Sequence, residues 1–274
     1  MAYMALAEVQ QYTQQFFELY QPEKEEVIRE NFSDPSNKEL CIFLQLHNDS
    51  ITPEILNTVD LIQEHVPEFD VYITMINEKS RGLIEKLLQE KKWVDSVKRI
   101  DLFRQNRGMD IGAFLWQLDQ VRSTPHNYTA LLKIHTKSSP GWRREMISPF
   151  TKPYIAYHVQ HMKQNPDVGI IGVSSRMYLN LEYGEAKYLR NMEKAVFGRY
   201  SNPGERGFIG GSVFLVNYKY LCEMMDEPQL RQYIEDCYTK APIGWCADHI
   251  PHAFERFISY YLSMKKKKIL GVKK

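Results

Sequence analysis

Four short stretches of this 274-residue sequence gather side chains that could bind anions, accept hydrogen bonds or transfer protons. In chain order they are NRGMDIGAFL (106–115), KIHTKSSPGWRR (133–144), FIGGSVF (208–214) and DHIPHAFER (248–256). Each stretch follows or interrupts an apolar run, or precedes a helical pattern. Ligands of open α/β sheets bind outside the carboxyl ends of the strands, so these stretches are the candidate ligand-binding segments.

The stretch at 133–144 brings five potential cations close to the end of one predicted strand: Lys133, His135, Lys137, Arg143 and Arg144. Burying such groups without partners costs free energy. A diphosphate would offset that cost, because lysine and arginine form charge-assisted hydrogen bonds with phosphoryl oxygens. The alternative is salt bridging with nearby acids. The residue types favour an anion site.

Asp110 stands at the start of a predicted helix, just beyond a strand and two residues after Gly108, which permits a tight turn. A carboxylate in this position caps the helix, or it accepts hydrogen bonds from ribose hydroxyls or from a sugar. The residue types alone leave both roles open.

Gly210 and Gly211 lie side by side within an apolar run of strand length. Adjacent glycines weaken a strand, since they add backbone entropy to the unfolded chain and supply no side chain to pack. Their presence indicates a bulge or the close approach of a ligand, and the sequence does not separate these two possibilities.

Asp248, His252 and Glu255 follow one another at spacings of four and three, which places them along one face of a helix that begins near His249. Pro251 suits the first turn of that helix. Acid and imidazole groups so arranged could act as general bases or bind a metal. Capping of the helix accounts for Asp248 equally well.

Buried strands that alternate with amphipathic helices must position these residues. The predicted strands are 40–46, 70–76, 97–103, 129–135, 169–174 and 208–216. The predicted helices are 53–64, 81–89, 111–122, 154–164, 218–238 and 249–264. Continuous apolar strands that alternate with helices are typical of an α/β fold with a mostly parallel central sheet flanked by helices. Residues 176–206 show weak periodicity and read as a long functional excursion from the sheet.

The predicted organisation is an N-terminal helical extension over residues 1–38, one domain over 39–264 and a basic tail over 265–274. A helix is expected over 5–31, because apolar residues recur there at helical spacing. The lysines of the tail read as solvated, and at most they make peripheral contact with anionic lipid headgroups. The formal net charge of +1 gives no global field to attract nucleic acid. No signal peptide or membrane span is evident, so a cytoplasmic location is expected.

The four stretches together resemble the ordered motif set of the rhamnan synthesis protein F family, over residues 39–262. That resemblance implies a GT-A-like single domain and transfer of an activated deoxyhexose or pentose from a UDP- or dTDP-sugar, such as dTDP-rhamnose, to a glycan acceptor. The implied donor-binding residues are Asn106, Arg107, Gly108, Asp110, Gly112, Lys133, His135, Thr136, Lys137, Trp142 and Arg143. The implied acceptor-binding residues are Gly210, Gly211, His252 and Arg256.

Many GT-A enzymes carry an Asp-x-Asp motif after the strand that here ends in KIHTK, and this sequence lacks it. Two mechanisms follow. In one, His135 and His252 hold Mn²⁺ or Mg²⁺; in the other, Lys137 and Arg143 replace the ion, and the enzyme needs no metal.

An inverting transfer needs a general base, for which Asp248 and Glu255 are the candidate catalytic residues. A non-catalytic module that binds a glycan or a nucleotide sugar is the main alternative. A glycoside hydrolase is a further alternative, but the cations at the strand end disfavour it, since glycan hydrolysis involves no diphosphate.

Overall fold

The computed structural model describes residues 26–32, 38–76, 78–179, 184–202, 207–244 and 249–273. Its strands are β1 (Glu26–Glu30), β2 (Leu40–Leu46), β3 (Phe69–Ile76), β4 (Val97–Phe103), β5 (Ala130–His135), β6 (Val168–Val173), β7 (Met177–Leu179), β8 (Gly207–Ile209), β9 (Phe214–Asn217) and β10 (Lys268–Val272). Its α-helices are α2 (Thr52–Gln63), α3 (Glu78–Gln89), α4 (Met109–Val121), α5 (Pro140–Ile147), α6 (Pro153–Gln164), α7 (Ala186–Phe197), α8 (Tyr218–Met225), α9 (Arg231–Thr239) and α10 (Ile250–Met264).

Eight strands form one sheet in the order β1-β4-β3-β2-β5-β9-β6-β10, and β7 and β8 form a separate two-stranded sheet. The four central strands, β4, β3, β2 and β5, run parallel to one another. Strand β9 is antiparallel to both β5 and β6, and β1 is antiparallel to β4. The predicted α/β fold with a mostly parallel central sheet is therefore confirmed.

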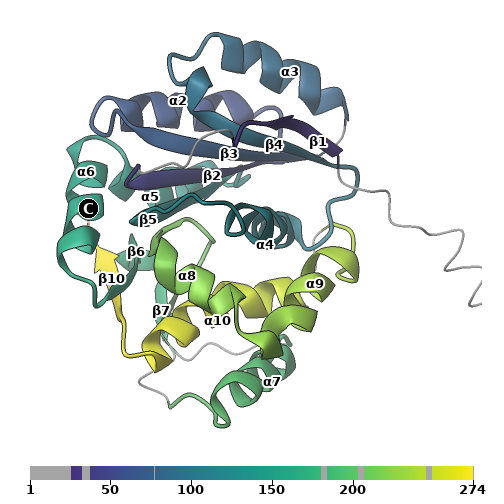
Figure 1. The fold of residues 1–274 in the computed structure, drawn as a ribbon, viewed down its shortest axis with the longest axis vertical. Helices are drawn as coiled ribbons and strands as arrows, with labels where there is room; N and C mark the ends of the chain where they lie inside the picture. Colours follow the sequence, from purple (N-terminus) through teal and green to yellow (C-terminus); the bar gives the residue numbers. More distant parts are fainter. Residues whose placement is uncertain are drawn as a thin grey trace, which may run out of the picture.

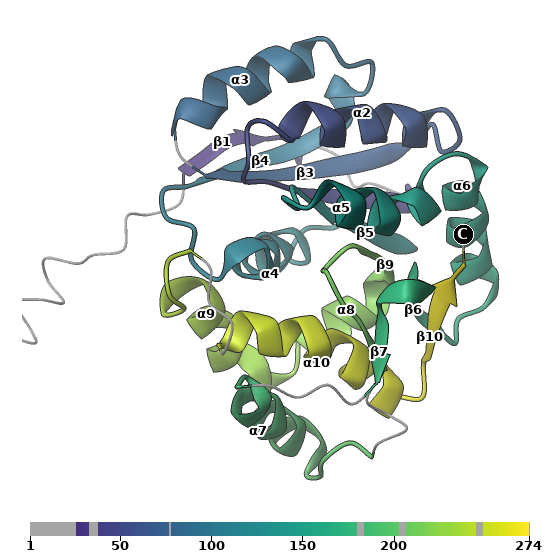
Figure 2. The same cartoon turned by 180° about the vertical axis from the view of Figure 1, so that it is seen from behind.

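Helices cover both faces of the large sheet (Figures 1 and 2). One core cluster joins the sheet to α2, α3, α5 and α6, and includes Ile55, Ile84 and Ile155. The other joins the sheet to α4 and α7 to α10, and includes Phe114 and Phe254. The three layers bury the central strands on both sides, which explains why these strands are continuous apolar runs.

The side chains of β2 alternate between these two cores. Ile42 and Leu44 belong to the cluster beneath α2, whereas Phe43 belongs to the cluster beneath α4. Successive residues of a strand point to opposite faces, so Gln45 shares the face of Phe43. A fully buried glutamine thus lies next to the last residue of an otherwise apolar strand, on the side of α4.

The N-terminal prediction is wrong for residues 26–30, which form edge strand β1 and not the end of a helix. Residues 1–25 of the expected helix lie outside the described residues. Pairing with β4 satisfies backbone groups at the open edge of the sheet, and Ile28 packs against the core beneath α2. The apolar residues of this segment recur at helical spacing, but its pairing with the open edge of β4 determines its conformation. The boundary of the extension at residue 38 stays a prediction.

The C-terminal segment is also not a frayed tail, because residues 268–272 form β10 parallel to β6. Its apolar side chains pack on both cores, Leu270 on one and Ile269 on the other. The preceding lysines have specific partners, since Lys265 pairs with Glu227 and Lys267 donates to the Tyr220 hydroxyl. Peripheral membrane contact through these lysines stays a prediction.

The expected single strand at 208–216 is two strands, β8 and β9, separated by a turn at Gly210, Gly211 and Ser212. The turn requires a left-handed backbone at two successive positions, with φ of 91° at Gly211 and 57° at Ser212. The paired glycines therefore mark a chain reversal between two sheets, and they are not a bulge in one strand. The excursion at 176–206 supplies β7, which pairs with β8, and helix α7.

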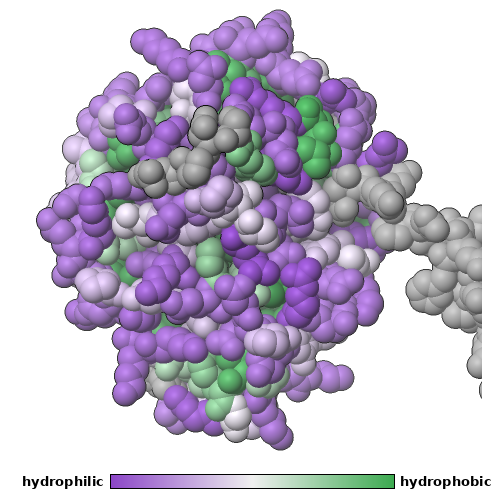
Figure 3. Space-filling model, in the orientation of Figure 1, coloured by the Kyte–Doolittle hydropathy of each residue, from purple (hydrophilic) through white to green (hydrophobic). Residues whose placement is uncertain are grey.

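Among the described helices, none is both long enough and apolar enough to cross a membrane. The face in Figure 3 is mostly hydrophilic, and its apolar patches are small and separated. The cytoplasmic location expected from the sequence stays a prediction.

Candidate active site at the carboxyl ends of the strands

Two adjoining cavities open at the carboxyl ends of β2 and β5. The larger one, the strand-end cavity, has a volume of about 270 Å³ and is lined by Gln45, His47, Asn48, Asn106, Met109, Asp110, His135, Thr136, Lys137 and Ser138. The smaller one, the helix-side cavity, has a volume of about 70 Å³ and is lined by Met109, Asp110, Ile111, His135, Lys137, Gly211, Ser212, Pro251, His252 and Glu255. Their shared wall consists of Met109, Asp110, His135 and Lys137. All four chemical stretches of the sequence contribute to this pair of cavities.

Asp110 lies at the centre of the site and is held by a buried lysine. The Nζ atom of Lys133, which is 0% exposed, donates to Asp110 Oδ2 at 2.5 Å and to the Ser212 carbonyl at 3.0 Å. The residue that caps α4 is Gly108, and no side chain bonds the cap position. Asp110 therefore does not cap α4. Its carboxylate faces the two cavities instead.

A turn between β8 and β9 connects the strand-end residues with helix α10. The Nε2–H of His135 donates to the Gly211 carbonyl at 2.9 Å, and the Gly211 N–H donates to Glu255 Oε1 at 2.5 Å. Gly211 is thus fixed from both sides, by an imidazole of β5 and by a carboxylate of α10. This contact places Glu255 in the wall that faces Asp110.

The electrostatics of the site favour neutral imidazoles beside an ionised carboxylate. Burial lowers the pKa of His47 to about 4 and that of His135 to about 4. Burial alone would raise the pKa of Asp110, but its interactions with His135 and with the ammonium group of Lys133 outweigh that effect and hold the pKa well below its usual range. Burial also lowers the pKa of Lys133, although Asp110 opposes this effect. Near neutral pH the imidazoles can therefore both donate and accept hydrogen bonds.

Lys137 is the cation that lines both cavities, and an aromatic stack holds it. Its Nζ atom lies 4.4 Å from the centroid of the Trp142 ring, and the Arg176 guanidinium lies 4.6 Å from the same ring. Arg176 in turn pairs with Glu145. Trp142 therefore acts on the site through Lys137, because it does not itself line either cavity.

Arg143 is directed away from the cavities. It forms a bidentate pair with Glu54 of α2, with Nε–Oε1 and Nη2–Oε2 distances of 2.9 and 2.5 Å, and its Nη1 also donates to the Lys137 carbonyl. Salt bridging with nearby acids, one of the two possibilities for this cluster, thus accounts for Arg143 and Lys133. Lys137 lines both cavities, so its ammonium group remains available to bind an anion there.

The predicted donor-binding residues in and after the loop before α4 fall into two groups. Some line the strand-end cavity, and others serve the packing of helices. Asn106 lines the strand-end cavity, whereas Arg107 donates to the Ala241 carbonyl at 2.9 Å. A Cβ atom at Gly108 would lie 2.1 Å from the Cys237 carbonyl oxygen, and one at Gly112 would lie 2.6 Å from the Arg107 carbonyl oxygen. The two glycines allow α4 to pack closely against the end of α9.

The predicted acceptor-binding residues are divided in the same way. His252 and Gly211 line the helix-side cavity. Arg256 instead forms a buried ion pair with Glu185, at 2.9 Å, and Gly210 leaves room for the Tyr178 ring, which a Cβ atom would approach to 2.5 Å. Asp248 lies outside the described residues.

Three lining residues, Gln45, His47 and Asn48, lie outside the four stretches identified in the sequence, and two more, Met109 and Ser138, lie within those stretches but were assigned no role. His47 and Asn48 could have been predicted to line the site, because they directly follow the first buried strand. Gln45 gives a subtler signal, since it is a polar residue next to the end of a strand whose other residues are almost all apolar.

The residues that the structure describes do not form a divalent metal site. Among the described residues, no group of three or more histidine, cysteine, aspartate or glutamate side chains has a metal-binding arrangement. Asp110 is engaged by Lys133, and the Nε2 atom of His135 is engaged by Gly211. His135 and His252 line the same cavity as Asp110 and Glu255, but these side chains are not arranged as a metal-binding group.

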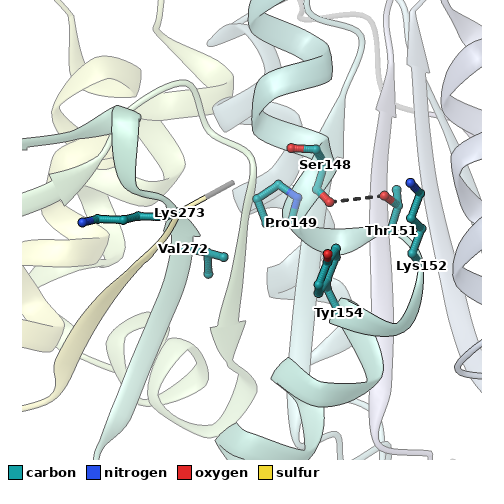
Figure 4. A pocket seen from close by; sticks show the side chains of 7 residues that line it. All are labelled: Ser148, Pro149, Thr151, Lys152, Tyr154, Val272 and Lys273. Atoms are coloured by element: carbon teal, nitrogen blue, oxygen red, sulfur yellow. Dashed lines mark hydrogen bonds between the residues drawn. The ribbon is translucent and has the colours of Figure 1, made fainter.

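A separate cavity of about 280 Å³ lies where β10 ends beside the start of α6 (Figure 4). Its lining consists of Ser148, Pro149, Thr151, Lys152, Tyr154, Val272 and Lys273. Two lysines give it a positive character, but it contains no carboxylate or imidazole. It therefore lacks the proton-transferring groups that distinguish the site at β2 and β5.

Comparisons with known proteins bear on this arrangement. No curated protein matches the chain. Among solved structures, a mannosyltransferase from Pyrobaculum calidifontis, PcManGT, in complex with GDP-Man and Mn²⁺, is 12% identical with a TM-score of 0.45, over 97% of this chain and 62% of that one. The mannosyltransferase Ktr4p from S. cerevisiae, in complex with GDP, is 10% identical with a TM-score of 0.37, over 98% of this chain and 80% of that one. Neither similarity is close enough to assign an activity.

The family model for rhamnan synthesis protein F matches residues 7–192, which is more than half of the chain. The matched segment contains the Asn106 and Lys133 stretches, whereas Gly211 and Glu255 lie beyond it. The chain belongs to the rhamnan synthesis protein F family.

Proposed function

We propose that the chain is a glycosyltransferase that moves rhamnose, or another deoxyhexose or pentose, from a UDP- or dTDP-sugar to a glycan acceptor. The observation that carries the proposal is that residues from the strand ends and residues from α10 line the same pair of adjoining cavities. Asp110, His135 and Lys137 form the wall that the cavities share, and His252 and Glu255 close the smaller cavity from α10. Family membership supports the same reading.

In this proposal the donor occupies the strand-end cavity, with its diphosphate near Lys137. As the bond between the anomeric carbon and the phosphate oxygen breaks, negative charge develops on the departing nucleoside diphosphate. A fixed ammonium group stabilises that charge in the transition state. Because Arg143 is committed to Glu54, Lys137 carries this role without it.

The acceptor hydroxyl approaches from the helix-side cavity in this scheme. Glu255 uses Oε1 to accept from the Gly211 N–H, so its second oxygen remains to take the hydroxyl proton. The acceptor oxygen then bonds to the anomeric carbon, and the nucleoside diphosphate leaves with the electron pair of the broken bond. Asp248 stays the alternative base.

A thermal-shift screen against UDP-, dTDP- and GDP-sugars, with and without Mn²⁺, tests the proposal. A ligand that binds only the folded protein stabilises it by about 2.7 kcal/mol at 100-fold saturation. We expect a UDP- or dTDP-sugar to raise the melting temperature, with transfer to an acceptor in a parallel assay. The absence of any shift at millimolar concentration would contradict a transferase, and binding without transfer would indicate a glycan- or nucleotide-sugar-binding module.

A further inference from the structure

Two carboxamides of the strand-end cavity have buried polar atoms without a hydrogen-bond partner in the part of the chain that the structure describes. Gln45 is 0% exposed, and neither its Nε2 nor its Oε1 atom has a hydrogen-bond partner among the described residues. The Oδ1 atom of Asn106 is likewise buried and without a partner in that part of the chain. Both residues line the same cavity. Buried polar groups without partners destabilise a fold, so their retention at one cavity calls for an explanation.

Gln117 shows how a structural glutamine behaves in this protein. It is also 0% exposed, and its Oε1 atom likewise has no partner among the described residues, but its Nε2 atom donates to the Ile73 carbonyl at 3.0 Å and to Asp101 at 2.9 Å. Gln45 makes no such contact with the sheet that surrounds it. Its strand neighbours in register are Thr74 and His135, which are polar as well. A polar floor therefore spans β3, β2 and β5 on the side of α4.

The chemistry of the cavity favours hydroxyl groups over a nucleobase. Among the described residues, no phenylalanine, tyrosine or tryptophan lines it, so that part of the chain offers no aromatic ring on which a base could stack. It offers instead two carboxamides, two imidazoles that burial keeps neutral and the Thr136 hydroxyl. Amides and neutral imidazoles each supply donors and acceptors, as a hydroxyl group does.

We infer that Gln45, together with Asn106, binds a vicinal diol of the ligand. One hydroxyl donates to Gln45 Oε1, and its neighbour accepts from Nε2, so both orphaned atoms are paired when the ligand is present. This inference rests on the proposed nucleotide-sugar donor. A UDP-sugar has two sources of a vicinal diol, namely the ribose of the nucleotide and the sugar that is transferred, whereas a dTDP-sugar, which contains 2′-deoxyribose, has only the transferred sugar.

Isothermal titration of the wild type and of Gln45→Met separates these sources. UDP against 2′-deoxy-UDP reports the ribose diol, and dTDP-rhamnose against dTDP reports the sugar. We expect the wild type to prefer the diol-bearing ligand of one pair by about tenfold or more, because its absence leaves buried polar atoms unpaired. The same preference should fall to near unity in Gln45→Met. Ligand-free Gln45→Met should melt at or above the wild-type temperature, since methionine has a similar volume and removes both orphaned atoms.

Gln117→Met is the matched control, because it removes an equally buried glutamine whose partners lie within the sheet. It should lower the melting temperature and leave both ligand preferences unchanged. Asn106→Ala provides a second test if Gln45→Met does not fold, and it should reduce the same preference.

The outcomes separate the inference from the function on which it rests. If the four ligands bind with the same preferences in the wild type and the variants, Gln45 and Asn106 do not bind a diol. The inference is then wrong, while the proposed function still stands. If none binds the wild type at millimolar concentration, the proposed function fails and the inference fails with it.

Discussion

At the scale of single residues, the site depends on how its charges are paired. The sequence indicated a group of cations that a diphosphate could neutralise. In the structure two of those cations, Lys133 and Arg143, already have carboxylate partners, Asp110 and Glu54. Lys137 remains at the cavities and rests on Trp142. The residue types thus identified side chains that gather at the cavities, but not which of the cations lines them.

Asp110→Asn should be costly for both folding and binding. The substitution leaves the buried ammonium of Lys133 without its counter-charge, and breaking a buried ion pair from one side costs about 3–5 kcal/mol. Urea unfolding measures that cost. The double variant Asp110→Asn with Lys133→Met removes both charges and should recover much of the stability.

Donor affinity distinguishes the role of Asp110 in binding from its role in the fold. We expect the double variant to fold well and still bind the donor weakly, because the carboxylate that faces the cavities is absent. Wild-type affinity in the stabilised double variant would show that Asp110 serves the fold alone.

At the scale of elements, the turn between β8 and β9 organises the site. Its backbone carbonyls accept from His135 and Lys133, and its N–H group at Gly211 donates to Glu255. The sequence signalled this place by two adjacent glycines, but it could not show that they reverse the chain between two sheets. Those hydrogen bonds join residues 44 to 79 positions apart, so no local pattern encodes them.

Gly211→Ala should damage this arrangement. The new Cβ atom would lie 2.2 Å from Met146 Sδ, at a φ of 91° that side chains rarely adopt. We expect unfolding to become easier by at least about 1–3 kcal/mol. Gly198→Ala is the matched control: Gly198 has a φ of 67°, and a Cβ atom added there would meet nothing within 4 Å. Equal losses in urea unfolding for the two variants would mean that the turn is not tightly packed.

At the scale of the whole molecule, the parallel core was predictable and its edges were not. Buried parallel strands such as β2, β3 and β5 show continuous apolar runs, which local reasoning identifies within a residue or two. Strands β1 and β10 are short and partly exposed. The charged residues of β1 resemble a polar helix, and β10 follows a run of lysines that resembles a tail. Both segments join the sheet because each pairs with a neighbouring strand, β1 with β4 and β10 with β6. Sequence reasoning also cannot place β9 between β5 and β6, because that order is set by long-range packing.

The stability of the whole protein should depend on pH through the buried imidazoles. The pKa of His135 is about 4 in the folded chain, against 6.5 for the unfolded reference. Between these values the unfolded chain binds more protons, so stability falls as the pH drops from 6.5 to 4. One such shift corresponds to about 3 kcal/mol. Asp101 acts in the opposite sense, because burial raises its pKa to about 6.

Comparison with a variant isolates the contribution of His135. His135→Gln keeps a side-chain donor for the Gly211 carbonyl but does not titrate. Its free energy of unfolding, followed by urea titration from pH 7 to pH 4, should fall less than that of the wild type. Parallel curves for the two proteins would show that His135 is not held neutral by the fold.

Acceptor-dependent release of the nucleoside diphosphate, measured for the wild type and for Glu255→Gln, tests the central claim most directly. Glutamine retains an oxygen that can accept from the Gly211 N–H, so the fold and donor affinity should be preserved. Turnover should fall by about 10²- to 10⁴-fold, because the proton acceptor is gone. Glu193→Gln, at a buried carboxylate of α7 that accepts from Ser201, should leave turnover unchanged. We expect release only with donor and acceptor together; the claim is contradicted if the wild type gives no release with any nucleotide sugar, or if Glu255→Gln retains at least a tenth of wild-type turnover.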